Sequence, residues 1–235
     1  RILVSQGLKR IRQGITPPGL LALFEVAGRN PQTANPFDLG FAVGPRLNAA
    51  GRLADMSLGI QLLLCDDPKI ALEIAQELDR INRERRVIES GMQESALAHL
   101  THLNTDERPA LCLWNPNWHQ GVVGIVASRL KERFNRPAII FAPAEGVDGE
   151  ALLRGSGRSI AGFHLRDALD LVSKRKPSII QKFGGHAMAA GLTIRQADFG
   201  FFEESFLQVS RELLNDDLLQ RRCIHDGELS PEELS

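Results

Sequence analysis

"ALCLWNPNWHQGVVGIVASRLKERFNRPAIIFAP", residues 110–143, sets the fold class of this chain. Its ends, 110–114 and 137–143, are short apolar runs typical of buried strands. Between them, residues 121–134 repeat apolar side chains at helical spacing, with charged residues on the opposite side. A strand, an amphipathic helix and a second strand in this order predict a βαβ unit with parallel strands. The chain is therefore expected to have an α/β fold.

The residues that follow extend the predicted sheet. Residues 151–159 are expected to form an antiparallel strand that ends in a loop rich in glycine, which makes the sheet mixed. Small residues at 187–194 predict another strand, and apolar spacing predicts helices at 163–173 and 199–214. We therefore expect a mixed sheet flanked by helices.

The residues before the sheet are predicted to be helical. Two short helices, 2–12 and 18–28, are separated by the helix-breaking "TPPG". A longer helix is expected to start at Asp67 and Pro68, an N-cap residue followed by a first-turn proline, and to run to about residue 103. At 1.5 Å per residue it would be roughly 54 Å long. This length suits a connector between two lobes, and the arginines of residues 80–86 are expected to face solvent.

Charge is unevenly distributed although the chain carries a net charge of only −1. Residues 1–60 hold 7 Lys and Arg against 3 Asp and Glu, and residues 109–200 hold 12 against 7. Residues 61–108 and 201–235 are acidic. Proteins that are neutral overall can still bind nucleic acid through one basic face. The alternative is an ordinary scatter of charge.

The composition also favours a cellular compartment. No apolar run approaches the roughly 18 residues that a membrane-spanning helix needs, and no signal peptide is visible. The three cysteines, Cys65, Cys112 and Cys223, lie far apart, as reduced thiols do. We expect a cytoplasmic protein that does not bind membranes.

Two stretches combine glycine with arginine in a way that suits phosphate binding. In "GPRLNAAGR" (44–52), Arg46 and Arg52 flank Asn48, and planar guanidinium groups pair well with phosphate oxygens. The alternative for this stretch is a helix with arginines on its surface. In "RGSGRS" (154–159), glycines give access to backbone N–H groups, and a phosphate would meet the side chains of Ser156, Arg158 and Ser159.

Two further stretches place a histidine beside glycine. In "WHQGVVG" (118–124), His119 precedes a predicted helix N-terminus, where anions are favoured; the alternative is a histidine that caps the helix. In "KFGGHAMAAGL" (182–192), His186 has neighbours with almost no side chain. His186 is expected to contact a phosphate or to transfer a proton, and the bare wall for the ligand would be formed by Gly184, Gly185, Ala190 and Gly191. A packed structural histidine is the alternative.

The sequence contains phosphate-binding residues but no recognisable metal-binding cluster. It has no DxD motif, no HExxH motif and no pair of adjacent histidines. His99 and His102 are spaced to share one face of the long helix, but no third ligand is evident.

Taken in order, "GPRLNAAGRL", "WHQGVVGIVASRLKERF", "GSGRS" and "FGGHAMAAGL" resemble the single-strand-specific DNA exonucleases of the DHH phosphoesterase family. "GGHAMAAG" is similar to the signature of DHHA1, the second lobe of that family. The resemblance implies an α/β DHHA1-type lobe preceded by a long connecting helix and the helical end of a DHH lobe. The implied domains are residues 1–55 (DHH lobe), 56–104 (connector), 105–214 (DHHA1) and 215–235 (start of an oligonucleotide-binding barrel).

The resemblance also implies an activity, the 5′-to-3′ hydrolysis of single-stranded DNA in repair and recombination. Two ions, Mn²⁺ or Mg²⁺, would be bound by family residues that this sequence lacks. Arg46, Asn48 and Arg52 would reach the phosphate from the DHH side. Ser156, Arg158 and Ser159 would hold the 5′-phosphate, and His186 would act near the metals.

Single-stranded DNA is the expected partner, with a single-strand-binding protein or a helicase as further partners. The alternatives are a non-catalytic nucleic-acid-binding or docking lobe and a small-nucleotide phosphoesterase of the same family.

Overall fold

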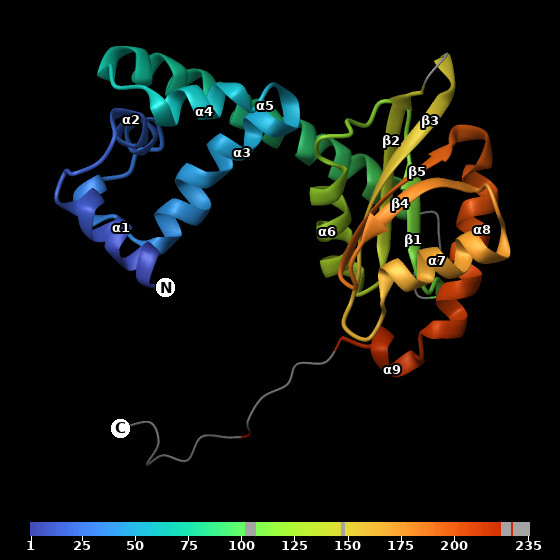
Figure 1. The fold of residues 1–235 in the computed structure, drawn as a ribbon. Coiled ribbons are helices and arrows are strands. Elements are labelled where there is room, and N and C mark those ends of the chain that lie inside the picture. Colours follow the sequence, from blue (N-terminus) through green and yellow to red (C-terminus); the bar gives the residue numbers. More distant parts are fainter. Residues whose placement is uncertain (102–106, 147–148, 222–226, 228–235) are drawn as a thin grey trace. The chain divides into compact units, whose positions relative to one another are not determined.

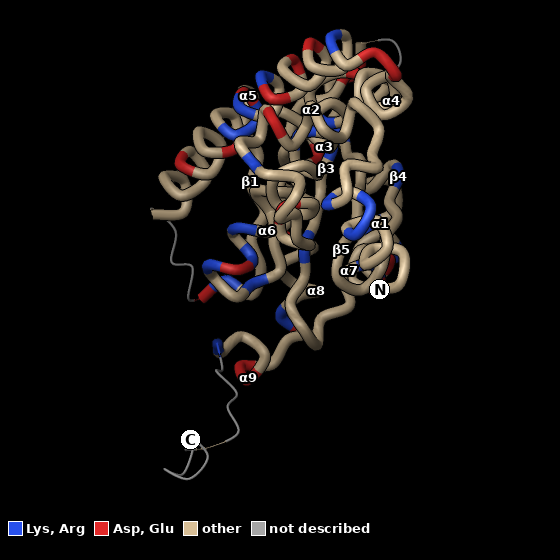
Figure 2. The backbone as a smooth tube through the Cα atoms, turned by 90° about the vertical axis from the view of Figure 1, so that its left-hand side faces the viewer, with Lys and Arg blue, Asp and Glu red and all other residues tan. Residues whose placement is uncertain are grey.

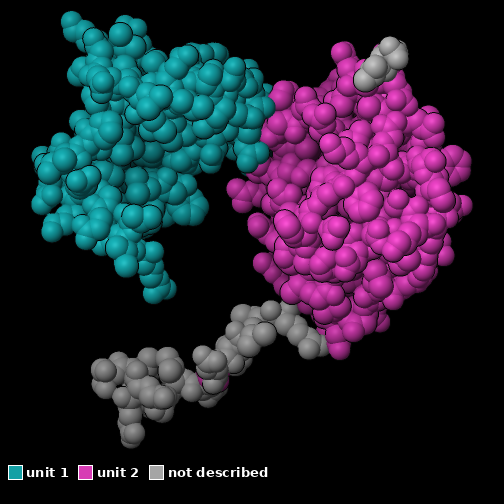
Figure 3. All heavy atoms as spheres, viewed as in Figure 1, with its two compact units in different colours: residues 1–97 teal, residues 98–235 magenta. Residues whose placement is uncertain are grey.

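The computed structural model describes residues 1–101, 107–146, 149–221 and 227. It divides the chain into two compact units, residues 1–97 and 98–235 (Figure 3). The boundary between the two units, at residues 97 and 98, falls within one long helix. It does not test the expected division into domains 1–55 and 56–104, which stays a prediction. Most of the segment 215–235, including Cys223, lies outside the described residues, as does His102.

The first unit is helical. Its two opening helices lie where the sequence predicts them, and three more follow a short 3-10 turn (Pro31–Thr33) and a π-helix (Asp38–Val43). The α-helices are α1 (Ile2–Arg12), α2 (Pro18–Val26), α3 (Gly44–Leu53), α4 (Ser57–Leu64) and α5 (Pro68–Thr101). The stretch "GPRLNAAGR" is thus α3, so the alternative is correct that it is a helix, but of its two arginines only Arg52 is exposed. The separate helix α4 was not expected from the sequence.

The long helix α5 begins as predicted. The Asp67 carboxylate accepts hydrogen bonds from the backbone N–H groups of Lys69 (2.8 Å) and Ile70 (3.3 Å), as an N-cap does. Acidic and basic residues alternate along the helix (Figure 2), and Arg80 pairs with Glu77 and Glu84 in solvent. None of the described helices combines the length and the apolar character that a membrane-spanning segment requires.

The middle of α5 differs from the prediction that residues 80–86 simply face solvent. Asn82 is buried, and the Arg85 side chain is only 13% exposed and pairs with Glu89 at 2.8 Å. Burial lowers the pKa of Arg85, and the positive charges of Arg86 and Arg52 lower it further. A hydrophobic stripe that runs along α5 thus becomes polar at its centre.

Replacing the buried Asn82 by an apolar residue should stabilise the protein. Neither its amide nitrogen nor its oxygen has a hydrogen-bond partner in the described part of the chain. Because an unpaired buried amide costs its full desolvation energy, Asn82→Leu should raise the free energy of unfolding by about 1–3 kcal/mol. Unfolding in urea, followed by the helical signal, measures this change through the shift of the midpoint. Ser90→Leu, an exposed change on the same helix, controls for helix propensity, and equal effects in both variants would contradict the prediction.

The second unit confirms the predicted α/β class and the mixed sheet flanked by helices. Its sheet has the order β1-β2-β3-β5-β4 (Figure 1). The β1 and β2 strands are parallel and are joined by α6, as the βαβ prediction requires, whereas the other pairs are antiparallel. The strands are β1 (Leu111–Trp114), β2 (Ala138–Glu145), β3 (Ala151–Arg158), β4 (Ile180–Gly185) and β5 (Ala189–Arg195). The helices are α6 (Val123–Phe134), α7 (Leu165–Arg175), α8 (Phe199–Leu213) and α9 (Asp216–Leu219).

The two faces of this sheet are covered differently. On one side, α7 and α8 bury an aromatic and aliphatic core that includes Phe141, Phe202 and Phe206 (Figure 1). On the other side lies α6, which contacts β2 and β3. Within the second unit, no described helix covers the corresponding face of the outer strands β5 and β4.

Two features of the sheet depart from the prediction. The glycines of "RGSGRS" lie within β3 rather than in a loop, because antiparallel partners on both sides hold the strand extended through Arg158. The β4 strand was not predicted, since "IQKFGG" lacks a clear alternation of apolar and polar residues and ends in glycines that disfavour strands.

Candidate nucleic-acid interface

The outward-pointing residues of β3, β5 and β4 form a basic surface. Alternate residues of a strand, and residues directly opposite each other on antiparallel neighbours, share one face of the sheet. The register therefore aligns them in three rows. These rows, here called the open face, are Arg158 and Ala189; Ser156, Gly191 and Gly184; and Arg154, Thr193 and Lys182. They hold three cations and no carboxylate.

The glycines in the middle row leave the backbone accessible. A Cβ atom added at Gly184 would meet no heavy atom within 4 Å, and one added at Gly191 would meet only the Gly155 carbonyl oxygen at 3.8 Å. The glycines that point to the other face behave differently. At Gly155 and Gly157, an added Cβ would lie 2.5 Å from Phe141 and 2.7 Å from Leu165. Packing requires the glycines on the core side, whereas those of the open face leave room for a ligand.

At one edge of the open face, the Arg158 guanidinium and the Ser156 hydroxyl lie beside the start of α6. The Arg158 guanidinium donates to Ser156 Oγ at 3.1 Å and to the Gly157 carbonyl at 2.8 Å. Gly124, in the first turn of α6, lies so close that an added Cβ would be 2.9 Å from Ser156 Oγ and 3.0 Å from the Arg158 guanidinium. The positive end of a helix dipole adds to the guanidinium charge there. This corner, the Ser156–Arg158 corner, suits an anion.

His186 lies in the turn between β4 and β5, and this turn is fixed by its backbone. The His186 N–H donates to Ala189 O (2.8 Å), while the carbonyls of Ala187 and Met188 accept from Leu165 (2.9 Å) and Ser159 (2.9 Å). Gly185 has φ +148°, and an added Cβ there would collide with Ala189 and Ala190. The imidazole itself is exposed. A rigid turn thus presents an accessible ring, as expected for a histidine that contacts a ligand.

Three of the predicted ligand contacts in the second unit point elsewhere, and one of them, Gly185, pairs with Ala190 on the side of the sheet opposite the open face. Ser159 is 1% exposed, and its hydroxyl donates to the carbonyl of Phe163 at 2.7 Å. The prediction that Ser159 binds phosphate is therefore wrong; its hydroxyl and its N–H instead fasten the turn that carries His186. Ala190 is 5% exposed and belongs to the core beneath the sheet, so it is not part of the open wall.

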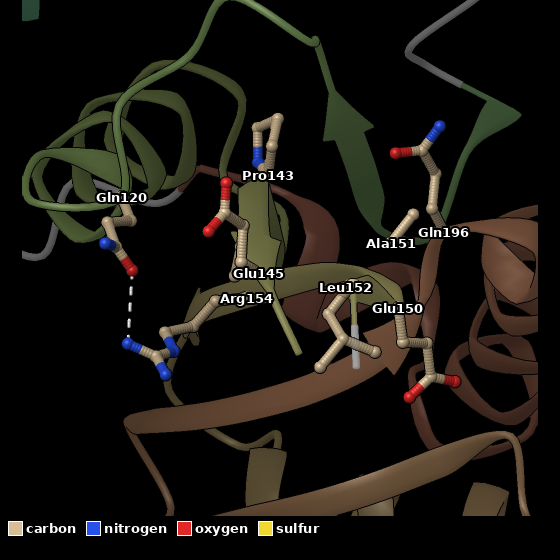
Figure 4. Close-up of a pocket in the computed structure, with 10 residues that line it drawn as sticks. Gln120, Pro143, Glu145, Glu150, Ala151, Leu152, Arg154 and Gln196 are labelled. Carbon is tan, nitrogen blue, oxygen red and sulfur yellow. Dashed lines mark hydrogen bonds between the residues drawn. The ribbon is translucent and has the colours of Figure 1, made fainter. Parts of the chain in front are cut away.

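The loop before α6 borders the open face. His119 Nδ1 accepts the Gly121 N–H at 3.0 Å, so its exposed ring also orders the loop, as the capping alternative implied. Gln120 Oε1 accepts a hydrogen bond from Arg154 Nη1 at 3.1 Å (Figure 4). This bond orients the Arg154 guanidinium at the far row of the open face.

In the first unit, Arg46 has a structural role. Its guanidinium forms an ion pair with Asp79 at 2.8 Å and donates to the carbonyls of Ala42 (2.6 Å) and Val26 (3.4 Å). The prediction that Arg46 reaches a phosphate is therefore wrong, because these partners occupy its donors and the side chain is only 11% exposed. Arg46 joins α2, α3 and α5 instead.

The other two residues of this stretch remain accessible. Asn48 and Arg52 lie four residues apart on α3 and are both exposed. Residues spaced in this way share one side of a helix. Arg52 also lies close enough to Arg85 for its positive charge to lower the pKa of Arg85. The proposed phosphate contacts of Asn48 and Arg52 keep their geometric basis.

No metal centre is found within the part of the chain that the structure describes. These residues contain no group of three or more His, Cys, Asp or Glu side chains that could hold a metal ion. His99 packs edge to face on Trp118 at 6.2 Å instead. Burial raises the pKa of the Cys112 thiol, which disfavours the thiolate that metals bind. The described residues do not fit a Mn²⁺ or Mg²⁺ site.

Sequence reasoning missed three residues of this interface: Arg154, Lys182 and Gly124. A usable signal was the alternation in "RGSGR", which places Arg154, Ser156 and Arg158 on one face once the segment is recognised as a strand. Lys182 could not be placed without the unpredicted strand β4. The role of Gly124 depends on how α6 packs on β3.

The chain is similar along its whole length to known proteins. It is 52% identical over 238 residues to the single-stranded-DNA-specific exonuclease RecJ of Escherichia coli K12, which covers all of this chain and 41% of that protein. The RecJ of Bacillus subtilis is 38% identical over 84% of this chain and 24% of its own length. The chain thus spans about two fifths of the first of these relatives.

Solved structures agree with the sequence comparison. The structure matches crystalline RecJ from Thermus thermophilus in complex with Mn²⁺, with a TM-score of 0.76 and 31% identity, over 91% of this chain and 30% of that one. A structure of the exonuclease RecJ bound to manganese matches with a TM-score of 0.74 and 31% identity, over 90% of this chain and 49% of that one. The DHHA1 domain family matches residues 107–216. By sequence and by fold, the chain is therefore similar to a segment of RecJ, and its residues 107–216 match the DHHA1 domain family.

Proposed function

We propose that this chain is the nucleic-acid-binding wall of a RecJ-type enzyme that hydrolyses single-stranded DNA from its 5′ end. The open face carries the proposal: its three rows are basic and free of carboxylates, and its glycines let a sugar-phosphate strand approach the backbone. Phosphate contacts of this kind supply most of the affinity for nucleic acid without selecting a sequence.

Within this wall, the Ser156–Arg158 corner would hold the terminal 5′-phosphate. The guanidinium supplies a charge-assisted donor, and the start of α6 adds its dipole. His186 would donate to a phosphate oxygen beside the reacting bond or transfer a proton there. Its fixed turn would keep the ring in place during the reaction. In the first unit, Asn48 and Arg52 of α3 would contact phosphate.

The metal ions of this reaction would be held by other parts of a RecJ-length protein, since the described residues do not fit them. Solved RecJ structures contain Mn²⁺ or Mg²⁺. Such ions activate water and stabilise charge at phosphorus. This chain would bind and orient the strand.

Partners and compartment extend the same proposal. A nuclease that consumes single-stranded DNA needs a helicase to supply it and meets single-strand-binding protein on its substrate. We therefore propose both as partners and the cytoplasm as the compartment. Support comes only from the function of the RecJ relatives.

A chimera tests the activity. In E. coli RecJ, the matching segment of 238 residues is replaced by this chain. We expect the chimera with Mn²⁺ to release mononucleotides from 5′-labelled single-stranded DNA. The 235-residue chain alone should bind the same DNA without cleaving it, because its described residues contain no metal-binding group.

Two results would count against this proposal. Metal-dependent cleavage by the isolated chain, absent from a mock purification, would show that it holds its own catalytic centre. A chimera that folds with a native melting transition but neither binds nor cleaves DNA would exclude the exonuclease role.

A further inference from the structure

We infer that the far row of the open face, Arg154, Thr193 and Lys182, is a second phosphate subsite, which holds the phosphate adjacent to the one at the Ser156–Arg158 corner. This inference rests on the proposed function and extends it by naming residues that set how many phosphates the wall binds. It follows from spacing, from charge and from the absence of aromatic side chains on the open face.

The spacing of the rows suits a DNA backbone. Ser156 and Arg154 are two residues apart on β3, as Gly191 and Thr193 are on β5, so neighbouring rows lie about 6.8 Å apart. This is close to the distance between successive phosphates in an extended single strand. A strand that runs along β3 and β5 would therefore place one phosphate at each of these two rows. The bare Gly191 in the middle row would let the strand lie close to the sheet.

The charges of the far row are available to a ligand. Lys182 is exposed, and its ammonium has no ion-pair or hydrogen-bond partner among the described residues. Arg154 is exposed as well, and its side chain donates to the neutral Gln120; Glu145 and Glu150 line the same pocket (Figure 4), but among the described residues neither forms an ion pair with Arg154. Thr193 adds a hydroxyl between them.

The next cation along the sheet marks the end of this surface. Arg195 pairs with Asp198 at 2.6 Å, and Glu150 accepts hydrogen bonds from Gln181 at 3.3 Å. Carboxylates therefore begin directly beyond the far row. The open face offers a basic strip that ends at Arg154 and Lys182.

The ligand chemistry follows from what the strip lacks. Its rows contain no aromatic side chain on which a base could stack, and the whole chain has no tyrosine. Single-strand binders that hold bases normally use such side chains. The far row should therefore recognise phosphate, independently of base sequence.

Salt dependence of binding tests the inference. Anisotropy measures the affinity of the 235-residue chain for a short 5′-phosphorylated oligothymidylate at several NaCl concentrations. Each lost phosphate contact should reduce the slope of log K against log salt by about 0.7. We expect this change, with a loss of affinity of about threefold to tenfold, in both Lys182→Gln and Arg154→Gln. Arg154→Lys should restore the slope.

Matched variants separate charge from shape. Lys174→Gln removes the same charge from α7, on the covered side of the sheet, and should leave the slope unchanged. Gly191→Val adds bulk to the middle row, where an added Cβ would meet only the Gly155 carbonyl oxygen at 3.8 Å, and it should weaken binding. The salt slope of Gly191→Val should differ little from that of the unsubstituted chain, whereas the slope of Lys182→Gln should be clearly smaller.

The outcomes distinguish the two proposals. If the unsubstituted chain binds and Arg158→Ala weakens it, but Lys182→Gln and Arg154→Gln bind as Lys174→Gln does, the second subsite is refuted and the binding wall stands. If the unsubstituted chain fails to bind at low salt, the wall and the subsite fail together.

Discussion

In the RecJ chimera that carries this chain, His186→Ala should lower kcat on single-stranded DNA by about 100-fold or more, with little change in melting temperature. Proton transfer by a positioned side chain typically contributes between about 10² and 10⁴ to a rate. The imidazole is exposed, so its removal leaves no cavity. The turn that carries it should persist, because its backbone makes the fixing hydrogen bonds.

The control for His186→Ala is a substitution that keeps a donor at the same place. His186→Asn retains a side-chain N–H and should recover part of the rate if His186 donates to a phosphate. It should recover nothing if the ring transfers a proton. Melting curves of both variants report on folding. A chimera that is destabilised by His186→Ala but remains fully active would refute the ligand-facing role and leave a packed structural histidine.

The parts of the fold that were predictable are those with local causes. The βαβ unit follows from apolar runs and helical spacing within residues 110–143, and the start of α5 follows from the adjacent Asp67 and Pro68. The β4 strand has no comparable signal. Its place in the sheet depends on pairing with β5, which supplies the hydrogen bonds that its glycine-rich sequence does not favour by itself.

The residue types of the candidate site were predictable from the sequence, but the directions in which the side chains point were not. Arg46 looks like a phosphate ligand until Asp79, 33 residues away, occupies its guanidinium. Ser159 and Ala190 lie next to true members of the open face, yet each faces the core. In a strand a shift of one residue reverses the face, so only the register separates Ala190 from Gly191.

The same register places Arg158 on the open face, and its loss should be the largest binding defect in the second unit. Arg158→Ala in the chimera should raise KM for a 5′-phosphorylated single strand by roughly 10-fold to 100-fold. One charge-assisted hydrogen bond to a phosphate contributes about 1.5–3 kcal/mol. A 5′-hydroxyl strand should be affected much less, because it lacks the group that the Ser156–Arg158 corner holds.

The comparison between the two substrates is what gives the Arg158 experiment its meaning. Arg158 also donates to Ser156 and to the carbonyl of Gly157, so its removal changes the corner even without DNA. A purely structural loss would affect both substrates equally, whereas loss of a terminal phosphate contact acts on one. Arg129→Ala removes an exposed arginine of α6 that pairs with Glu132, and it should change neither KM. Equal defects on both substrates would make Arg158 a general backbone contact, and the 5′ end would then have to be recognised elsewhere.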